Sequence, residues 1–407
     1  SSVFGDITGR KFGGVSVLDE KNGRIFTYDN NSNLLYVFGG LGQGRGDFKT
    51  PVAISEVRNK IMVLDSSANS LQVFSPTKYA ESIHQALVFY NEGRYSQSAS
   101  KWSEVLSRNV NFSMAYRGLG LNQMHQENYK KAMKMFKLGQ DRNDYSKSFR
   151  HFRREYLKNN FSLIIYIVVI LILIVFIAIK LKNKYITEES FHTIATSEEE
   201  EYGFLQNISF PFYTIFHPFS GFWESKRENK GNVKVATVIL FLIAATYIFM
   251  RQYTGFIFNE RNLNNINIYR EFFSVVIPFG LWCIVNWSLT TIMEGKGTIK
   301  DIYITTAYAL VPIIIVNIPL TVISHYLVLE EATFYYFFMG LSLVWGLMLI
   351  FFGTMTIHDY SLGKMLLTTV LIIAGMGFVL FLGMLFFSLA EQVIGFFTQI
   401  YYELMRI

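Results

Sequence analysis

Long apolar segments dominate the chain from Phe161 onward. Six of them hold at most one charged residue over 18 or more positions. At about 1.5 Å of rise per residue, each is long enough to cross the roughly 30 Å hydrocarbon core of a bilayer. The sequence therefore predicts six membrane-spanning helices, at Phe161–Ile179, Val233–Met250, Phe272–Ile292, Ile302–Leu327, Phe334–Thr356 and Met365–Leu389.

The first 80 residues have a different pattern, in which short alternating segments repeat. An offset of 36 residues places Ile25 on Ile61, Asp29 on Asp65, and Phe38 on Phe74. Alternation of apolar and polar positions is typical of half-buried β-strands. We therefore expect strands at Arg24–Tyr28, Leu34–Phe38, Ile61–Leu64 and Leu71–Phe74.

Two motifs in these repeats are Gly46-Asp47-Phe48 with Pro51, and Val63-Leu64-Asp65 followed by Leu71-Gln72-Val73-Phe74. They resemble the NHL family of β-propellers. The resemblance implies an incomplete propeller, because a closed ring needs about four to eight blades. Val3-Phe4-Gly5 matches Val37-Phe38-Gly39, so we expect the chain to begin on the last strand of an earlier blade, with more blades upstream. The resemblance to NHL propellers also implies binding of a protein or glycan at loop faces rather than catalysis.

A second repeat covers residues 79–146, where an offset of 34 places Tyr95 on Tyr129 and Trp102 on Phe136. The spacing of Tyr116, Leu119, Gly120, Ala132, Phe136 and Gly139 resembles that of tetratricopeptide (TPR) repeats. This implies antiparallel helical hairpins that approach closely at Gly120 and Ala132. Asp144 replaces the usual proline, so the second hairpin is expected to run on. The repeats form either a peptide-binding groove or a helical spacer, and His84 and His125 read as ordinary polar positions.

Charged residues flank the first predicted span. A basic run precedes it: Lys147, Arg150, Arg153, Arg154 and Lys158. This run suits either anionic lipid headgroups or a solvated helix end. The acidic run Glu198–Glu201 follows the span and favours a solvated linker over a cation site, because adjacent carboxylates repel one another.

An aromatic segment from Ser209 to Trp223 suits the boundary of a bilayer. From Pro218 we expect a short interfacial helix with an aromatic side and a basic side. The residues concerned are Phe219, Phe222 and Trp223 on one side, and Lys226, Arg227 and Lys230 on the other. The segment FHPFSGFWESKRENKG, followed by five apolar spans, resembles the Yip1 membrane domain of bacterial proteins over roughly residues 205–390. This resemblance implies a small multi-pass scaffold or transport-associated domain.

The composition agrees with an integral membrane protein, since 51% of the residues are hydrophobic and 16% are aromatic. The flanks of the spans account for much of the net charge of +6, and nucleic acid need not be invoked. Cys283 is the single cysteine, which excludes an intrachain disulfide and a cysteine metal cluster. No nucleophile with a base, metal spacing or nucleotide loop is present, so we expect no cofactor and no enzymatic activity. The glycine run Gly39–Gly46 matches no phosphate-binding pattern and leads into a strand, so we expect an interblade loop.

The distribution of basic residues predicts the orientation. With the loop from Lys180 to Lys234 in the cytoplasm, ten basic residues lie on that side and four on the other. Both termini then lie outside a bacterial cell membrane. The five basic residues before Phe161 oppose this orientation, but they belong to a domain large enough to be exported regardless of charge.

Polar side chains inside the spans are the default candidates for function. They are Asn286 and Asn317, the latter between Pro312 and Pro319, which could break that span and expose carbonyls as transport sites do. A neutral Asn equally makes a single interhelical hydrogen bond. In the tail, Val393, Phe397, Ile400, Leu404 and Ile407 recur at steps of four and three. This stripe either contacts a partner helix or continues the last span along the interface.

The predicted fold is thus a multi-domain membrane protein with a partial β-propeller, α-helical TPR hairpins and an α-helical membrane domain, with six spans in total. The domains are 1–78 propeller blades, 79–146 TPR-like repeats, 147–184 juxtamembrane helix and first span, 185–204 acidic cytoplasmic linker, 205–390 Yip1-like domain, and 391–407 amphipathic C-terminal helix.

The leading functional hypothesis is a non-enzymatic accessory protein. Its extracellular module binds a ligand, protein or glycan, and its membrane domain docks on membrane lipids and transporter permease subunits. Bacterial Yip1-like proteins of this style resemble companions of carbohydrate ABC importers. The alternatives are an autonomous channel or transporter, and a membrane-shaping or trafficking factor.

Overall fold

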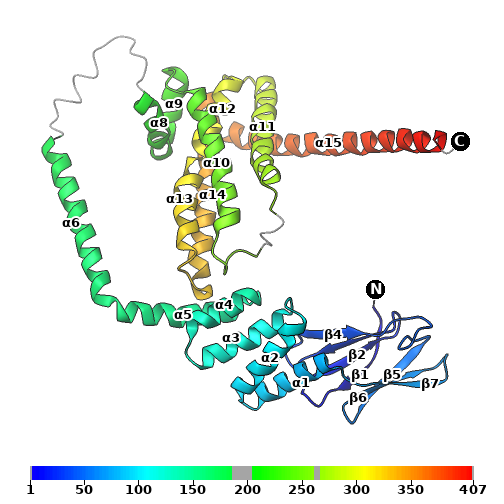
Figure 1. Ribbon diagram of the computed structural model, residues 1–407. Helices are drawn as coiled ribbons and strands as arrows, with labels where there is room; N and C mark the ends of the chain where they lie inside the picture. The colour runs from blue at the N-terminus through cyan, green and yellow to red at the C-terminus, as the bar shows by residue number, and fades with distance from the viewer. Residues whose placement is uncertain (1, 186–203, 261–265, 406–407) are drawn as a thin grey trace. The chain divides into compact units, whose positions relative to one another are not determined.

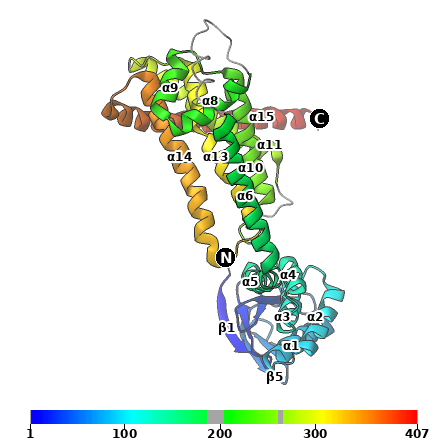
Figure 2. The same ribbon diagram turned by 90° about the vertical axis from the view of Figure 1, so that its left-hand side faces the viewer.

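The computed structural model describes residues 2–185, 204–260 and 266–405. The chain divides into two compact units, Ser1–Ile172 and Leu173–Ile407, which are described separately. The predicted acidic run Glu198–Glu201 lies outside the described residues. Figures 1 and 2 show the elements of both units.

The first unit begins with two antiparallel sheets. The first sheet has the order β1-β2-β3-β4, and the second has the order β5-β6-β7. Their strands are β1 (Phe4–Gly9), β2 (Val15–Asp19), β3 (Arg24–Tyr28), β4 (Leu34–Phe38), β5 (Pro51–Val57), β6 (Lys60–Asp65) and β7 (Ser70–Phe74). The four strands predicted from the repeat are confirmed as β3, β4, β6 and β7.

The first strand is placed differently from the prediction. β1 pairs antiparallel with β2, with Ile7 opposite Val17, so it is the edge strand of the first sheet and not the last strand of a preceding blade. The match between Val3-Phe4-Gly5 and Val37-Phe38-Gly39 reflects a shared edge-strand pattern, which does not determine the pairing partner. The two sheets do not close into a ring, and the partial propeller remains a prediction.

Side chains of β1 join the two sheets. Asp6 Oδ2 accepts the backbone N–H of Ile54 at 2.8 Å, and Thr8 Oγ1 accepts that of Glu56 at 3.2 Å. These bonds occupy donors on the free edge of β5 that would otherwise stay unpaired. Apolar side chains of both sheets and of the loop before β5 form one cluster: Leu18, Ile25, Phe48, Ile54, Ile61 and Val63.

Five helices follow the sheets: α1 (Lys78–Asn91), α2 (Tyr95–Arg108), α3 (Ser113–His125), α4 (Tyr129–Leu138) and α5 (Arg142–Asn159). α1 packs on α2 and α3 on α4, as expected for two helical hairpins. Gly120 lies against the buried Phe136, and a Cβ there would come within 2.6 Å of its ring. Gly118 is tighter, because a Cβ would lie 2.1 Å from Nε1 of the buried Trp102. Small residues therefore set the helix spacing.

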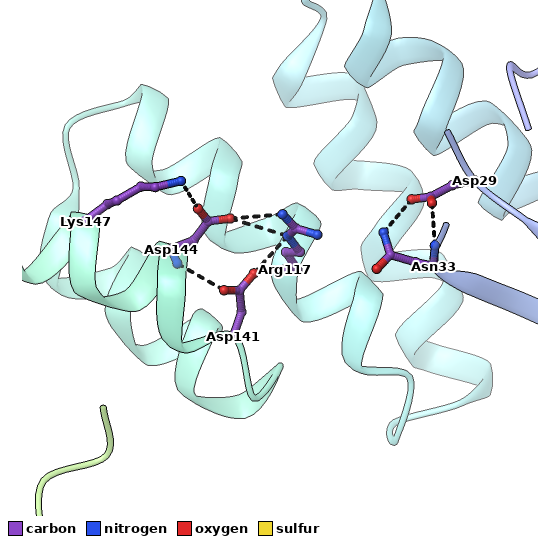
Figure 3. A network of polar contacts seen from close by, with 6 residues as sticks. All are labelled: Asp29, Asn33, Arg117, Asp141, Asp144 and Lys147. Carbon is purple, nitrogen blue, oxygen red and sulfur yellow. Dashed lines mark hydrogen bonds and ion pairs between the residues drawn. The ribbon is translucent and has the colours of Figure 1, made fainter. Parts of the chain in front are cut away.

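The end of the second hairpin differs from the prediction. α4 stops at Leu138, and Asp141 caps a new helix by accepting the N–H of Asp144 at 3.0 Å. Arg117 of α3 donates to Asp141 at 2.8 Å and to Asp144 at 3.3 Å, and Lys147 adds a bond of 2.8 Å (Figure 3). Asp144 is thus a helix-start residue that fixes α5 to α3. It does not extend the hairpin.

A turn of the first sheet is closed by an acidic side chain. Asp29 Oδ1 accepts the N–H of Asn33 at 2.8 Å, and Oδ2 accepts its side-chain amide at 2.8 Å (Figure 3). Asp65, its repeat equivalent, accepts backbone N–H groups of Lys49 and Thr50. Burial would raise the pKa of Asp65, but these donors outweigh it and hold the pKa below its ordinary value.

α1 is joined to the first sheet through an aromatic and polar contact. His84 of α1 stacks on Phe12 with ring centroids 4.2 Å apart, and its Nε2 lies 2.6 Å from the hydroxyl of Tyr36 on β4. His84 is only 6% exposed. The sequence-based interpretation of His84 as an ordinary polar position is therefore corrected: it is a buried residue that holds the sheet against the helices.

The membrane unit is entirely helical in its described residues. Its elements are the end of α6 (Phe161–Tyr185), α8 (Phe204–Phe216), α9 (Pro218–Arg227), α10 (Val233–Tyr253), α11 (Ile268–Ile292), α12 (Ile299–Ala309), α13 (Val311–Ile323), a 3₁₀ turn (Leu329–Glu331), α14 (Ala332–His358) and α15 (Leu362–Leu404). Among the described residues, five candidate spans are long and apolar enough to cross a membrane, or up to six if the bent pair α5 and α6 counts as one. The first predicted span, in α6, stays a prediction.

The span predicted at Ile302–Leu327 is interrupted. α12 ends at Ala309 and α13 begins at Val311, with Leu310 between them and Pro312 in the first turn of α13. Proline has no N–H to donate and is tolerated in a first helical turn, which explains a break just before it. Buried side chains of α12 and α13 form the centre of this unit with residues of α8, α9, α10, α11 and α14.

α15 is one continuous helix where a span and a separate C-terminal helix at 391–407 were expected. No proline or glycine falls between Leu389 and Val393, so nothing in the sequence stops the helix there. Its first part packs on α11 and α14. Figures 1 and 2 show the rest leaving the bundle sideways, at the end where α8 and α9 lie.

Candidate functional site: a charged junction and an exposed apolar helix

A charged junction gathers three connections at one end of the membrane unit. Asp359 follows α14, and its carboxylate forms two ion pairs. One is with the guanidinium of Arg227 on α9 at 2.9 Å, and the other is with the ammonium of Lys296, in the turn before α12, at 3.1 Å. Asp359 adopts a left-handed backbone conformation with φ 55°, which ends α14 and turns the chain into α15. One carboxylate thus ties α9 and the turn before α12 to the connection between α14 and α15.

Two further contacts close this junction. Lys226 of α9 donates to the backbone carbonyl of Ile357, one of the carbonyls that α14 leaves without a helical partner. The backbone N–H of Gly297 donates to Nδ1 of the buried His358 at 3.2 Å. The junction therefore satisfies the end of α14 with groups from distant parts of the chain.

The electrostatics of the junction keep its charges paired. The hydrogen bond from Lys296, aided by the positive charges of Lys296 and Arg227, holds the pKa of Asp359 below its ordinary value against the opposite effect of burial. Burial lowers the pKa of Lys226, and Asp359 opposes this shift. Arg227 and Lys296 are half-exposed or more, so each pair contributes at most about 1 kcal/mol.

A helix, α9, is present where the interfacial helix was predicted, with Pro218 in its first turn, and its location at a membrane interface stays a prediction. Its aromatic residues divide between two environments. Phe219 and Trp223 are about half exposed, whereas Phe222 is fully buried in the core of the unit. Lys230 pairs with Glu224 and Glu228 at 2.9 and 2.7 Å. α9 is therefore anchored by Phe222, Lys226 and the ion pair of Arg227 with Asp359, while Phe219 and Trp223 stay about half exposed.

The two intramembrane asparagines differ in their partners. Asn317 of α13 donates to Oγ of Ser342 on α14 at 3.0 Å. This is the single interhelical hydrogen bond that the sequence suggested as the alternative to a transport site. Asn286 of α11 is fully buried, and neither its Nδ2 nor its Oδ1 has a hydrogen-bond partner. Within the described part of the chain, no hydrogen bond joins Asn286 to Asn317, so the structure does not combine them into one site. Asn286 is the more unusual, because a buried amide without partners costs about 1–3 kcal/mol per group.

The predicted C-terminal stripe lies on the exposed part of α15. Val393 and Phe397 are more than half exposed and Ile400 is 36% exposed. The side chain of Leu404 and all of Ile407 lie outside what the structure describes. Exposure is not confined to the stripe, since Phe386, Phe387 and Phe396 are also 62–73% exposed. On a helix most of these residues share one broad side, and Glu391, Gln392, Thr398 and Gln399 fall on the opposite side, so this part of α15 is amphipathic.

The chemistry available to these residues is limited. No group of three or more His, Cys, Asp or Glu residues that could hold a metal ion occurs among residues 2–185, 204–260 and 266–405. Cys283 is buried in the core of the membrane unit. The junction offers charge and hydrogen bonds, and α15 offers apolar surface. This combination suits binding and anchoring.

The helical architecture and the candidate spans define a multi-pass membrane protein. Residues 212–384 match the model of the Yip1 domain, from within α8 to within α15. The match confirms the predicted resemblance for the membrane unit and leaves the NHL and TPR resemblances as predictions. No curated protein matches the chain.

Proposed function

We propose that the protein is a non-enzymatic accessory subunit whose Yip1 domain docks laterally on the permease subunits of a membrane transport complex. The N-terminal unit, with its sheets and helical hairpins, binds a protein or glycan on the outer side of a bacterial cell membrane. A carbohydrate ABC importer is the complex that the sequence resemblance favours.

The exposed length of α15 carries this proposal. Of its most apolar 18-residue window only 6% is buried, against 50% for the span formed by α12 and α13. The apolar segment Leu362–Tyr402 has 41 residues, which correspond to about 62 Å. A bilayer core of roughly 30 Å would cover this length only at a tilt of about 60°, beyond the usual range of 0–40°.

From Met365 to Ala390, α15 carries no charged residue, and in its last part Glu391, Gln392, Thr398 and Gln399 fall on one side. The other side is apolar, and an apolar helix side is normally buried against other apolar groups. Permease helices supply a cover of matching chemistry, since they present apolar side chains at the same depth. The charged junction has the complementary role of holding α9 and the start of α15 in place.

Purification in a mild detergent, with mass spectrometry of the intact assembly, tests the proposal. We expect permease and ATPase subunits at fixed stoichiometry. Phe396→Gln and Phe397→Gln together should reduce the bound partner at least about tenfold, whereas Phe241→Gln on α10, with a similarly exposed ring of 57%, should not. A protein that emerges alone, or equal loss in the control, would contradict the proposal.

A second candidate, an autonomous channel or transporter, is favoured by one observation. Asn286 is buried without a partner, and the neighbouring helix pair is broken at Leu310. Liposomes that contain only this protein should then show ligand flux, and Asn286→Leu or Asn317→Ala should abolish it. An unchanged rate in both variants would exclude these residues as the site.

A further inference from the structure

A cavity of about 510 Å³ lies in the N-terminal unit, bordered by both sheets and the start of α1. Its walls come from the end of β4, the glycine-rich loop before β5, the first residues of β6, the end of β7 and the first turn of α1. The volume is within the range of roughly 300–1,000 Å³ that is typical of small-molecule sites. The sequence predicted only an interblade loop here, because the glycine run matches no known phosphate-binding pattern.

The polar side chain that distinguishes this cavity is Arg10, in the turn between β1 and β2. Arg10 is 7% exposed and lines the cavity, and neither its Nε nor its Nη1 has a hydrogen-bond partner. Its guanidinium lies 5.6 Å from the ring centroid of Phe12 and also interacts with the hydroxyl of Tyr36. A guanidinium stays protonated in proteins, so it cannot escape burial by losing its charge.

The carboxylate nearest to Arg10 is that of Glu56, and both groups act on the hydroxyl of Tyr36. No ion pair to Arg10 occurs within the described part of the chain. Glu56 instead accepts the backbone N–H of Lys11 through Oε2 at 3.0 Å, and its Oε1 has no hydrogen-bond partner. Arg45 adds a second positive charge to the cavity wall, and Asp47 the single negative one. The carboxylate of Asp47 accepts the backbone N–H of Gly44 at 2.9 Å, so it closes its own loop.

Aromatic side chains form much of the remaining wall. They are Tyr36, Phe38, Phe74 and Tyr79. Rings of this kind suit stacking with a planar or cyclic molecule, while the positive charges of Arg10 and Arg45 suit a carboxylate or phosphate. The glycines keep the wall open: Gly46 has φ 93°, a conformation that other residues rarely adopt.

We propose that this cavity binds a small ring-bearing organic anion, whose carboxylate or phosphate pairs with Arg10 and whose ring packs against the aromatic wall. The anionic group of the ligand balances the excess of positive charge that Arg10 and Arg45 leave over Asp47 in the cavity wall. It is independent of the docking role of the membrane unit, and it gives the N-terminal unit a small-molecule ligand in addition to any protein or glycan at its surface.

Calorimetric titration of the full chain in detergent tests this inference. The probes are glucuronate and glucose 6-phosphate, which carry a carboxylate and a phosphate on a hexose ring, and glucose as the neutral analogue. We expect at least one anion to bind at least about tenfold more tightly than glucose. Comparing the two anions distinguishes carboxylate from phosphate as the preferred group.

Variants connect the binding to the cavity. Arg10→Met should weaken binding of the anion at least about tenfold, since it removes a positive charge that attracts the anion. Arg94→Met is the control, because Arg94 is similarly basic, pairs with Glu92 and lies outside the cavity wall. Circular dichroism establishes that each variant is folded, and Arg10→Lys, which keeps the charge, should lose less affinity than Arg10→Met. Failure of both anions to bind, equal binding of glucose, or unchanged affinity in Arg10→Met would overturn the proposal.

Discussion

His84 makes the stability of the N-terminal unit depend on pH. Its ring is buried between Phe12 and Tyr36, where α1 meets the first sheet. Burial, with a smaller effect of the positive charge on Arg10, lowers the pKa of His84 from 6.5 to about 4. The folded state therefore keeps His84 neutral between these values, whereas the unfolded chain takes up a proton as the pH falls below 6.5.

The size of the effect follows from the shift in pKa. Each pKa unit corresponds to about 1.36 kcal/mol, so a shift of about 2.5 units predicts a loss of about 3 kcal/mol in the free energy of unfolding. The stability is fully present above pH 6.5 and is lost as the pH falls to about 4. The buried carboxylates Asp65 and Asp144 have lowered pKa values, so their contribution is lost only at more acidic pH.

Hydrogen exchange of the full chain, followed by mass spectrometry and corrected for intrinsic exchange rates, measures the effect in peptides of α1 and β4. We expect opening free energies to fall by about 3 kcal/mol between pH 6.5 and 4. His84→Phe keeps the stack on Phe12 and should remove the pH dependence. His125→Gln, at an exposed position on α3, should retain it. If the opening free energy depended on pH equally in the unmodified protein and in His84→Phe, the reasoning would be refuted.

Two substitutions test the packing of each unit. Gly118→Ala should lower the free energy of unfolding by about 1–3 kcal/mol, because its Cβ would lie 2.1 Å from Trp102. The control Gly9→Ala, whose new Cβ has no atom within 4 Å, should change the free energy of unfolding by less than about 0.5 kcal/mol. Equal urea midpoints for the two variants would contradict this expectation. Lys226→Met should increase hydrogen exchange in α9, because it removes a hydrogen bond to α14 worth about 1 kcal/mol. Arg227→Met should increase exchange less, because that side chain is half exposed. A larger increase in Arg227→Met than in Lys226→Met would show that Arg227 is the stronger anchor.

The elements with a clear hydrophobic period were the ones that the sequence predicted well. The 36-residue repeat located β3 and β4 to the residue, and uninterrupted apolar runs located α10, α11 and α14 to within a few residues. Period and length report local geometry directly. They do not specify which strand pairs with which, and for this reason β1 was assigned to an earlier blade.

The individual sites depend on contacts between distant residues. Phe222 has the same aromatic character as Phe219, yet only Phe222 is buried in the core, because α9 meets α12 and α14 on that face. The roles of Arg10, His84 and Asp359 could not be read from sequence, since each depends on partners 26 or more residues away or on a cavity built from several strands. The positive φ of Asp359 could not be predicted either, because Asp tolerates this backbone conformation but does not require it.

Site-specific photo-crosslinking in native membranes tests the docking of α15 most directly. A photoreactive benzoylphenylalanine replaces Phe386 or Phe397 on α15, and Val238 on α10 serves as a control with 57% exposure. The account predicts that both α15 positions crosslink to one multi-pass permease subunit and that the control position does not. Crosslinks to lipid alone from Phe386 and Phe397, or the same protein crosslinked from Val238, would contradict it.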